Sequence, residues 1–211
     1  MNIKQVITCS VLSLILTGCA TTIDYKKNLQ QAGNCCAKLS DVKYKKLKYD
    51  EKVSKEVGVE GDKSRSFKSG KSFYLPVELP PYEGAYEIQI ESIAQGNKIF
   101  IPRIALLDGH YKIIKQISSS SFVLRNGAAK HQFFVNSDLN YRYMVLYTSP
   151  EDLDKKGKQI QDTTQVIPIV AGGFIFYYTE WGDITRTITS AEGGKLFVNV
   201  LKYAPVKIGA K

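Results

Sequence analysis

The sequence has little of the material from which most catalytic and metal sites are made. Its 211 residues include 2 His, 4 Cys, 2 Met and 1 Trp, and neither His110 nor His131 stands at a metal-ligand spacing from a Cys. No G-x-S-x-G, H-E-x-x-H or P-loop motif occurs. The sequence therefore predicts no catalytic residue, no metal site and no cofactor. A paired-carboxylate glycosidase is the one enzyme class that the residues leave open, although none of them favours it.

Long apolar runs are also missing, since no segment reaches the 18 residues of a transmembrane helix. The longest, 6–16 (VITCSVLSLIL), follows Lys4 and leads into Leu16-Thr17-Gly18-Cys19. That order is typical of a bacterial lipobox. We expect residues 1–18 to be a signal peptide and Cys19 to be acylated, which anchors the protein to a membrane. Ala20 after the Cys indicates the outer membrane, facing the periplasm. The alternative is an ordinary secretory signal with a coincidental Cys.

Positive charge is concentrated near this anchor. Residues 26–71 hold 13 Lys and Arg against 6 Asp and Glu, whereas residues 72–211 hold 15 against 13. We expect 19–70 to form a basic arm, which is either simply solvated or attracted to anionic lipid or cell-wall polymer. Nucleic acid is not an expected partner, because an exported lipoprotein does not routinely meet it.

The rest of the chain is patterned for strands. The sequence is 44% hydrophobic and has 13 Tyr and 9 Phe, a composition that favours a globular, β-rich fold. From Lys71 onward, apolar and polar residues alternate in short segments separated by turn signals. They are 73–79, 86–91, 99–107, 111–117, 122–124, 131–135, 141–148, 174–179, 184–189 and 195–203. This pattern predicts a β-sandwich or jelly-roll-like domain over residues 71–205.

Helical signals are few. Apolar spacing within 24–39 predicts a short N-terminal helical segment, interrupted at Gly33-Asn34. Ser149 followed by Pro150 predicts a second short helix over 151–157. We expect the polar residues that follow, up to Gln165, to form a surface loop.

Cys35 and Cys36 are the two cysteines left once Cys9 is removed and Cys19 is acylated. In an oxidising compartment they could form a disulfide with each other, stay as free or buried thiols, or bond another molecule. Their Cα atoms stand about 3.8 Å apart across a trans peptide, below the usual disulfide range of roughly 4.4–6.8 Å. All three states stay open.

Several segments together resemble one family. They are 35–47, Gly70-Lys71-Ser72-Phe73-Tyr74, Val77-Glu78-Leu79-Pro80, Glu91-Ser92, 100–108 (FIPRIALLD), 143–148 (YMVLYT) with the acidic helix start, and 192–196 (EGGKL). In this order they resemble the maltose operon periplasmic protein (MalM) family over most of residues 35–200. The resemblance implies a periplasmic protein linked by operon to maltose and maltodextrin uptake, with no catalytic motif. We therefore expect a non-catalytic accessory protein; the alternative is an envelope-associated structural or adaptor lipoprotein that binds anionic lipid, peptidoglycan or a protein.

One segment matches what sugar binding requires, namely an aromatic platform beside polar groups. It runs through Tyr177, Tyr178, Glu180, Trp181 and Asp183, and a turn expected at Gly182-Asp183 would place it at a rim of the sandwich. We therefore treat these five residues as a candidate carbohydrate site. The alternative is that the aromatics belong to the core of the sandwich.

Overall fold

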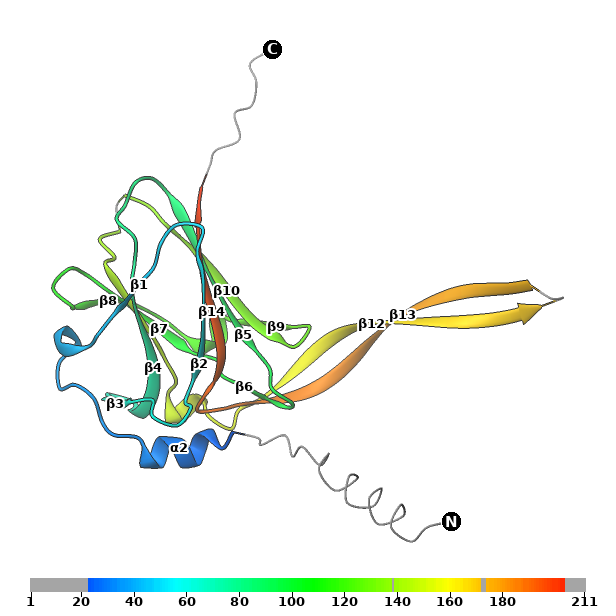
Figure 1. Cartoon of the computed structure of the whole chain (residues 1–211), viewed down its shortest axis with the longest axis horizontal. Coiled ribbons are helices and arrows are strands. Elements are labelled where there is room, and N and C mark those ends of the chain that lie inside the picture. Colours follow the sequence, from blue (N-terminus) through cyan, green and yellow to red (C-terminus); the bar gives the residue numbers. More distant parts are fainter. Residues whose placement is uncertain (1–22, 138, 172–173, 204–211) are drawn as a thin grey trace, which may run out of the picture.

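Figure 1 shows a computed structural model of the chain, in which residues 23–137, 139–171 and 174–203 are described. For residues 159–181 and for Asp183 only the backbone is described. The expected signal peptide 1–18 and Cys19 lie outside the described residues. The structure confirms a mainly β, sandwich-like fold, with two sheets that form a body and one long hairpin that projects from it.

The first sheet has six strands. Its order is β1-β4-β11-β7-β8, and β3 also pairs with β4. β1 and β3 pair with the two ends of one edge of β4, and Pro76 falls between the two pairings. That position suits a residue without a backbone N–H. The strands are β1 (Lys45–Lys46), β3 (Ser64–Phe67), β4 (Gly70–Glu78), β7 (Arg103–Leu107), β8 (Ile113–Ile117) and β11 (Tyr143–Tyr147).

The second sheet has eight strands in the order β2-β14-β5-β10-β9-β12-β13-β6. At its centre β5 pairs antiparallel with both β14 and β10, so that Ile90 lies opposite Val198 on one side and His131 on the other. The strands are β2 (Lys52–Val57), β5 (Tyr86–Ile93), β6 (Lys98–Ile99), β9 (Val123–Arg125), β10 (Ala128–Val135), β12 (Lys156–Ala171), β13 (Phe174–Ser190) and β14 (Gly194–Lys202).

The expected N-terminal helix is present as α2 (Tyr25–Gln31). The Asp24 side chain caps it by accepting a hydrogen bond from the Lys27 N–H at 3.0 Å, and the helix ends just before Gly33. Three short 3-10 helices, η1 (Leu39–Asp41), η2 (Ser119–Ser121) and η3 (Pro150–Asp152), lie in loops. Among the described residues, none of the helices has the length and apolar character needed to cross a membrane.

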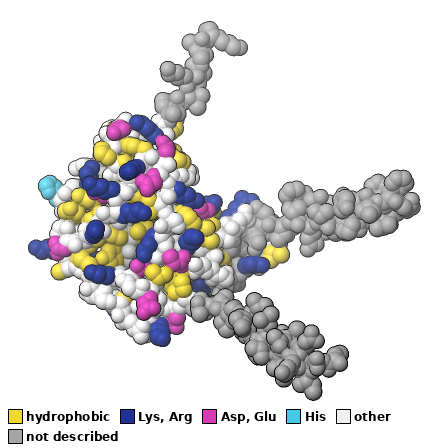
Figure 2. All heavy atoms as spheres, in the orientation of Figure 1, with side chains coloured by type: hydrophobic (Ala, Val, Ile, Leu, Met, Phe, Trp, Pro, Cys, Tyr) yellow, Lys and Arg dark blue, Asp and Glu magenta, His cyan; other side chains and the backbone are white. Residues whose placement is uncertain are grey.

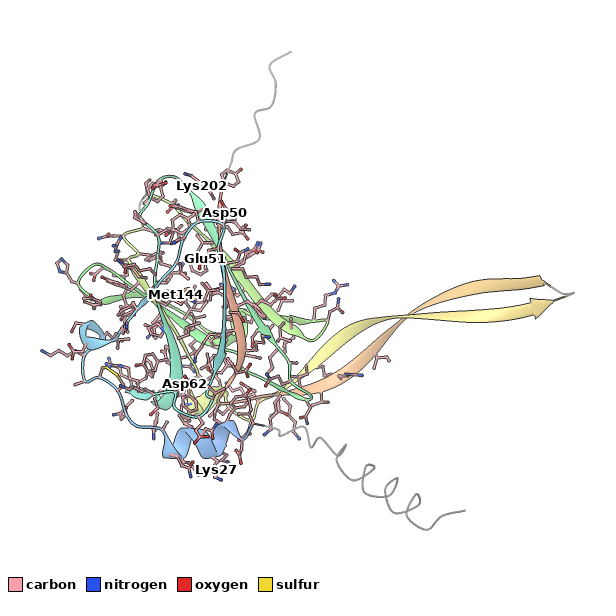
Figure 3. All side chains as sticks on the ribbon, in the orientation of Figure 1. Lys27, Asp50, Glu51, Asp62, Met144 and Lys202 are labelled. Carbon is pink, nitrogen blue, oxygen red and sulfur yellow. A yellow bond between two sulfur atoms is a disulfide. The ribbon has the colours of Figure 1, made fainter. Side chains whose placement is uncertain are left out.

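The core lies between the two sheets and follows the period of two. Along β5, Tyr86, Ile88 and Ile90 are buried and alternate with half-buried polar residues. Met144 on β11 is fully buried and lies in the middle of the body in Figure 3. β7 and β11 read instead as continuous apolar runs, because their outer face is covered as well, by the residues that precede β1 and by β3.

Several local predictions are wrong. The segment 99–107 is not one strand, because β6 ends at Ile99 and β7 begins at Arg103 in the other sheet. The helix expected over 151–157 is only the three-residue η3, because the chain turns back after Asp152 and enters β12. The loop up to Gln165 and the turn at Gly182-Asp183 do not exist: β12 and β13 pair without interruption, and Asp162 stands opposite Asp183. The basic segment also contributes strands, since β1, β2 and β3 all precede Lys71.

Candidate functional site

The candidate site is centred on Arg103, at the start of β7. Its Nε donates to Asp152 Oδ2 at 2.5 Å, and its Nη2 donates to Glu151 Oε2 at 2.9 Å. Lys155 Nζ lies 2.8 Å from the other oxygen of Asp152. Asp152 is 4% exposed, so this carboxylate receives hydrogen bonds from two cations while almost out of water. We call these four residues the Arg103 cluster.

Local sequence brings the two acids to Arg103. β11 ends at Tyr147, and Pro150 opens η3, whose turn is closed by a 2.8 Å bond from the Asp152 N–H to the Ser149 carbonyl. Gly70 at the start of β4 makes room for this turn. A Cβ on Gly70 would stand 2.6 Å from Pro150 Cγ, and its φ of +127° already disfavours any side chain.

The charges of Arg103 and Asp152 are fixed at neutral pH. Burial alone would raise the pKa of Asp152, but hydrogen bonds from Arg103, Lys155 and Ser119, together with the Arg103 charge, lower that pKa to about 2. The same hydrogen bond to Asp152 raises the pKa of Arg103 further above its usual range. Neither group exchanges protons near pH 7. The cluster is therefore a permanent ionic tie between β7 and η3 that can orient a polar ligand.

A groove of about 510 Å³ lies on one side of Arg103, between β3 and β8. Its aromatic wall is Phe67 stacked on Tyr147, with ring centroids 3.9 Å apart and planes 11° from parallel. The polar wall carries the exposed side chains of Lys115 and Gln116 on β8. We call this hollow the β3–β8 groove. It combines a flat apolar surface with hydrogen-bonding groups.

A smaller pocket of about 380 Å³ lies on the other side of Arg103, at the base of the long hairpin. Ser119, Phe122 and Lys155 line it together with Ser190. The Ser190 hydroxyl is buried and has no hydrogen-bond partner among the described residues. A buried hydroxyl without a partner costs about 1–3 kcal/mol, so this hydroxyl would gain from a polar ligand.

The outer face of the first sheet carries a second aromatic group, whose rings are half-buried. Tyr44, Tyr111 and Tyr143 contact one another, with Tyr143 at centroid distances of 4.6 Å from Tyr44 and 4.5 Å from Tyr111. The Tyr44 hydroxyl donates to the Leu39 carbonyl at 3.0 Å. Burial and the neighbouring Tyr111 raise the pKa of Tyr44. These rings pack the chain before β1 onto the sheet and so continue the core.

The five residues proposed for sugar binding all lie on β13, within the long hairpin. Tyr177 and Tyr178 stand opposite Pro168 and Ile167, and Trp181 stands opposite Thr164. Because the turn at Gly182-Asp183 is absent, they are not at a rim of the sandwich. The side chains of Tyr177, Tyr178, Glu180, Trp181 and Asp183 lie outside the described residues, so sugar binding there stays a prediction.

Cys35 and Cys36 are joined by a disulfide bond in the structure. They lie between α2 and η1, where the Cys35 N–H donates to the Ser64 carbonyl of β3 at 2.6 Å. Arg65 donates to the carbonyls of Cys36 and Ala37. The described residues hold no group of three or more His, Cys, Asp or Glu that could bind a metal ion.

Sequence reasoning missed the Arg103 cluster as a site. Both halves lie in segments that carry the family resemblance, Arg103 within FIPRIALLD and the two acids in the expected helix start. In the sequence, however, Glu151 follows Arg103 by 48 positions. Only the pairing of β7 with β11 brings them together. No local pattern reports such a contact.

The fold and the cluster define a β-sandwich protein with a surface groove beside a cluster of ion pairs. Residues 69–169 match the family model described as maltose operon periplasmic protein precursor (MalM), which confirms the resemblance seen in the sequence. The family's name places its members in the periplasm and associates them with the maltose operon. No curated protein and no solved structure matches the chain. The matched range contains the whole Arg103 cluster.

Proposed function

We propose that this chain is a non-catalytic lipoprotein that faces the periplasm from the outer membrane and assists maltodextrin uptake. The observation that carries the proposal is the β3–β8 groove, which adjoins the Arg103 cluster. The cluster lies inside the family-matched range, and Phe67 of the groove lies two residues before it. The carboxylates of the cluster are held in place by ion pairs with Arg103 and Lys155. The pKa of Asp152 is lowered and that of Arg103 is raised. That chemistry suits the positioning of a neutral polar ligand better than proton transfer.

The groove has the two surfaces that a glucan needs. Sugar rings present an apolar face, which packs on an aromatic ring, and a rim of hydroxyls, which seek amides and charged groups. Phe67 supplies the first surface, while Gln116 and Lys115 supply the second. Ser69 also lines the groove, and its buried hydroxyl has no hydrogen-bond partner among the described residues.

Calorimetric titration with maltohexaose tests the groove. We expect saturable binding that weakens at least about tenfold in Phe67→Ala, which removes the stacking surface, and several-fold in Gln116→Ala, an exposed position with little effect on folding. Phe134→Ala is the matched control, because Phe134 is 54% exposed on β10 of the other sheet. Equal affinity in all three variants, or no binding by the wild type, would refute a glucan groove.

A titration with maltohexaose that is followed by Trp fluorescence distinguishes the groove from the β13 segment proposed for sugar binding. Trp181 is the only Trp in the chain, so its fluorescence reports directly on the β13 segment. If the groove is the site, maltohexaose leaves Trp181 emission unchanged and Trp181→Ala binds normally. A saturable change in emission, with binding lost in Trp181→Ala, would instead support the segment containing Tyr177 and Glu180.

Lipid attachment at Cys19 is tested independently of sugar binding. Cells grown with labelled palmitate should label the wild-type protein, and Cys19→Ala should be unlabelled and remain soluble or uncleaved. Equal labelling of the two proteins would exclude Cys19 as the acylated residue. Fractionation of the wild type then distinguishes the outer membrane from the inner membrane.

A second candidate, an envelope-associated adaptor, is supported by the basic surface. Figure 2 shows Lys and Arg side chains spread over the visible face of the body, and the segment 26–71 accounts for most of the net charge. If this charge binds the envelope, a chain beginning at Ala20 should bind anionic vesicles or peptidoglycan less strongly as salt is raised, because exposed charges are screened. Salt-independent binding, or none, would remove the electrostatic role.

A further inference from the structure

The long hairpin, β12 with β13, has almost no contact with the rest of the sheet. The two strands pair from Lys156↔Thr189 to Ala171↔Phe174. On its outer edges, β9 pairs with β12 only at Ile160, and β6 pairs with β13 only at Thr189 and Ser190. Within the described residues, no other strand pairs with it. It therefore projects from the body as a ribbon, as Figure 1 shows, and its backbone runs on for about 36 Å beyond Ile160. We call it the arm.

The arm has a polar half and an apolar tip. Between Gln161↔Ile184 and Gln165↔Glu180 the paired residues include Asp162, Glu180 and Asp183. Beyond them, 166–171 (VIPIVA) and 174–178 (FIFYY) contain no charged residue. Because neighbours along a strand alternate between faces, apolar residues occupy both faces of the tip.

A two-stranded ribbon cannot bury its apolar residues by itself. Two strands alone form no layered core, and an isolated hairpin is only marginally stable in water. A contiguous apolar surface on a soluble protein indicates a contact with something else. The tip is therefore expected to contact an apolar partner. The polar half of the arm holds the tip away from the body.

The start of the described chain indicates which partner is near. Asp24 and Tyr25 line a hollow of about 640 Å³ together with Gln95 and Lys98, and Lys98 pairs with Thr189 at the base of the arm. The Tyr25 hydroxyl is also hydrogen-bonded to Gln95. Cys19 precedes Ile23 by four residues, which span at most about 14 Å. An acyl anchor at Cys19 thus holds the base of the arm close to a bilayer.

Two further features match a bilayer surface. Aromatic residues mark the junction between the apolar tip and the polar half, where Tyr177, Tyr178 and Trp181 follow one another on β13; Trp and Tyr are enriched where membrane proteins cross the headgroup region. The base of the arm carries exposed cations, among them Lys156 and Arg186, which anionic headgroups attract.

We propose that the tip of the arm inserts into the interface of the bilayer that holds the acyl anchor, giving the body a second attachment. This inference rests on the lipid attachment proposed above. Both edges of the tip carry backbone N–H and C=O groups that hydrocarbon cannot hydrogen-bond. The insertion is therefore shallow and stops at the headgroups. The anchor alone leaves the body free to rotate; anchor and arm together fix which side of the body faces the periplasm.

Trp181 serves as the probe. The mature acylated protein is reconstituted into vesicles that contain brominated phospholipids, and we expect its Trp fluorescence to be quenched. Ile169→Glu, which places a charge in the tip, should lose most of the quenching, whereas Gln161→Glu adds the same charge in the polar half and should keep it. Equal quenching of both variants, or no quenching of the wild type, would overturn the proposal.

Failure of the anchor is distinguished by flotation, since an unacylated protein does not float with the vesicles at high salt. In that case the chain beginning at Ala20, which contains every described residue, is mixed with anionic vesicles. A blue shift of Trp181 emission that Ile169→Glu abolishes supports the arm without the anchor, and absence of the shift refutes it. If Ile169→Glu instead converts a lipid-free oligomer into a monomer in sedimentation, the tip binds a second copy and the bilayer proposal is wrong.

Discussion

The sandwich body and the arm use the same antiparallel pairing but treat their apolar residues in opposite ways. In the body, a strand such as β11 has a neighbour on each edge and a covered surface on each face, so that Val145 and Leu146 are both fully buried although they lie on opposite faces. In the tip of the arm, β12 has β13 as its one neighbour among the described residues. An apolar sequence stabilises the fold in the first case and is available for binding in the second.

This difference separates stability from attachment within one chain. The Arg103 cluster and the groove lie on the body, where packing holds their geometry. The arm departs from the body next to the cluster, since β12 begins one residue after Lys155. A change in the arm should therefore alter where the protein sits and leave the groove intact.

The largest expected effect comes from making one truncation in both regions. Leu146→Ala removes a fully buried side chain and should lower the free energy of unfolding by about 3 kcal/mol. Ile169→Ala in the arm should change it by less than about 0.5 kcal/mol, because β13 is the one strand that pairs with β12 there among the described residues. Urea unfolding of the two variants in lipid-free buffer measures the contrast. A loss of more than about 2 kcal/mol in Ile169→Ala would mean that the arm packs as the body does.

Alternation and turn residues predict most strands of the body after Lys71. β5 has the pattern of a half-buried strand, and the turns at Gly96-Asn97, Asp108-Gly109 and Asn126-Gly127 all separate strands in the structure. The arm was divided wrongly, into a loop and two strands, because Gly182-Asp183 has the composition of a turn. Gly182 and Asp183 stay in a strand because they pair with residues of β12. Those partners, Thr163 and Asp162, lie 19 and 21 positions away in the sequence.

The site was less predictable than the fold for the same reason. Phe67 and Tyr147 stack across two strands that do not pair with each other, and both pair instead with β4. Phe67 belongs to the segment expected to be a basic arm, where loop and an edge strand are expected but the weak alternation does not locate β3. Contacts of this range depend on register, which a single sequence does not report.

A smaller effect is expected in acid, through Asp152. Its pKa of about 2 in the folded state lies below the roughly 3.9 of an unfolded Asp. The unfolded state therefore binds more protons between these values, so the stability contributed by Asp152 is complete above about pH 5 and is lost as the pH falls through 2. The contribution is about 2 kcal/mol.

Urea unfolding between pH 2 and pH 6 measures this contribution. Asp152→Asn should unfold about 2 kcal/mol more easily at pH 6 and should show a flatter dependence on pH below 5. Asp154→Asn is the matched control, since Asp154 is exposed two residues later. If Asp152→Asn and wild type have parallel pH profiles, the ion pairs of Asp152 contribute no pH-dependent stability to the body.

The smallest expected effect concerns the Cys35–Cys36 bond at the edge of the body. Stabilisation by a disulfide grows with the length of the loop that it closes, and two adjacent residues close the shortest loop there is. The segment is also held without the bond, through the Cys35 N–H on Ser64 and the Arg65 side chain on Ala37. Reduction, or Cys35→Ser with Cys36→Ser, should therefore lower stability by less than about 1 kcal/mol.

Thiol titration of the mature monomer in denaturant should find no thiol before reduction and two afterwards. Two thiols before reduction would exclude the bond, and a dimer on a non-reducing gel would show that these cysteines link two molecules.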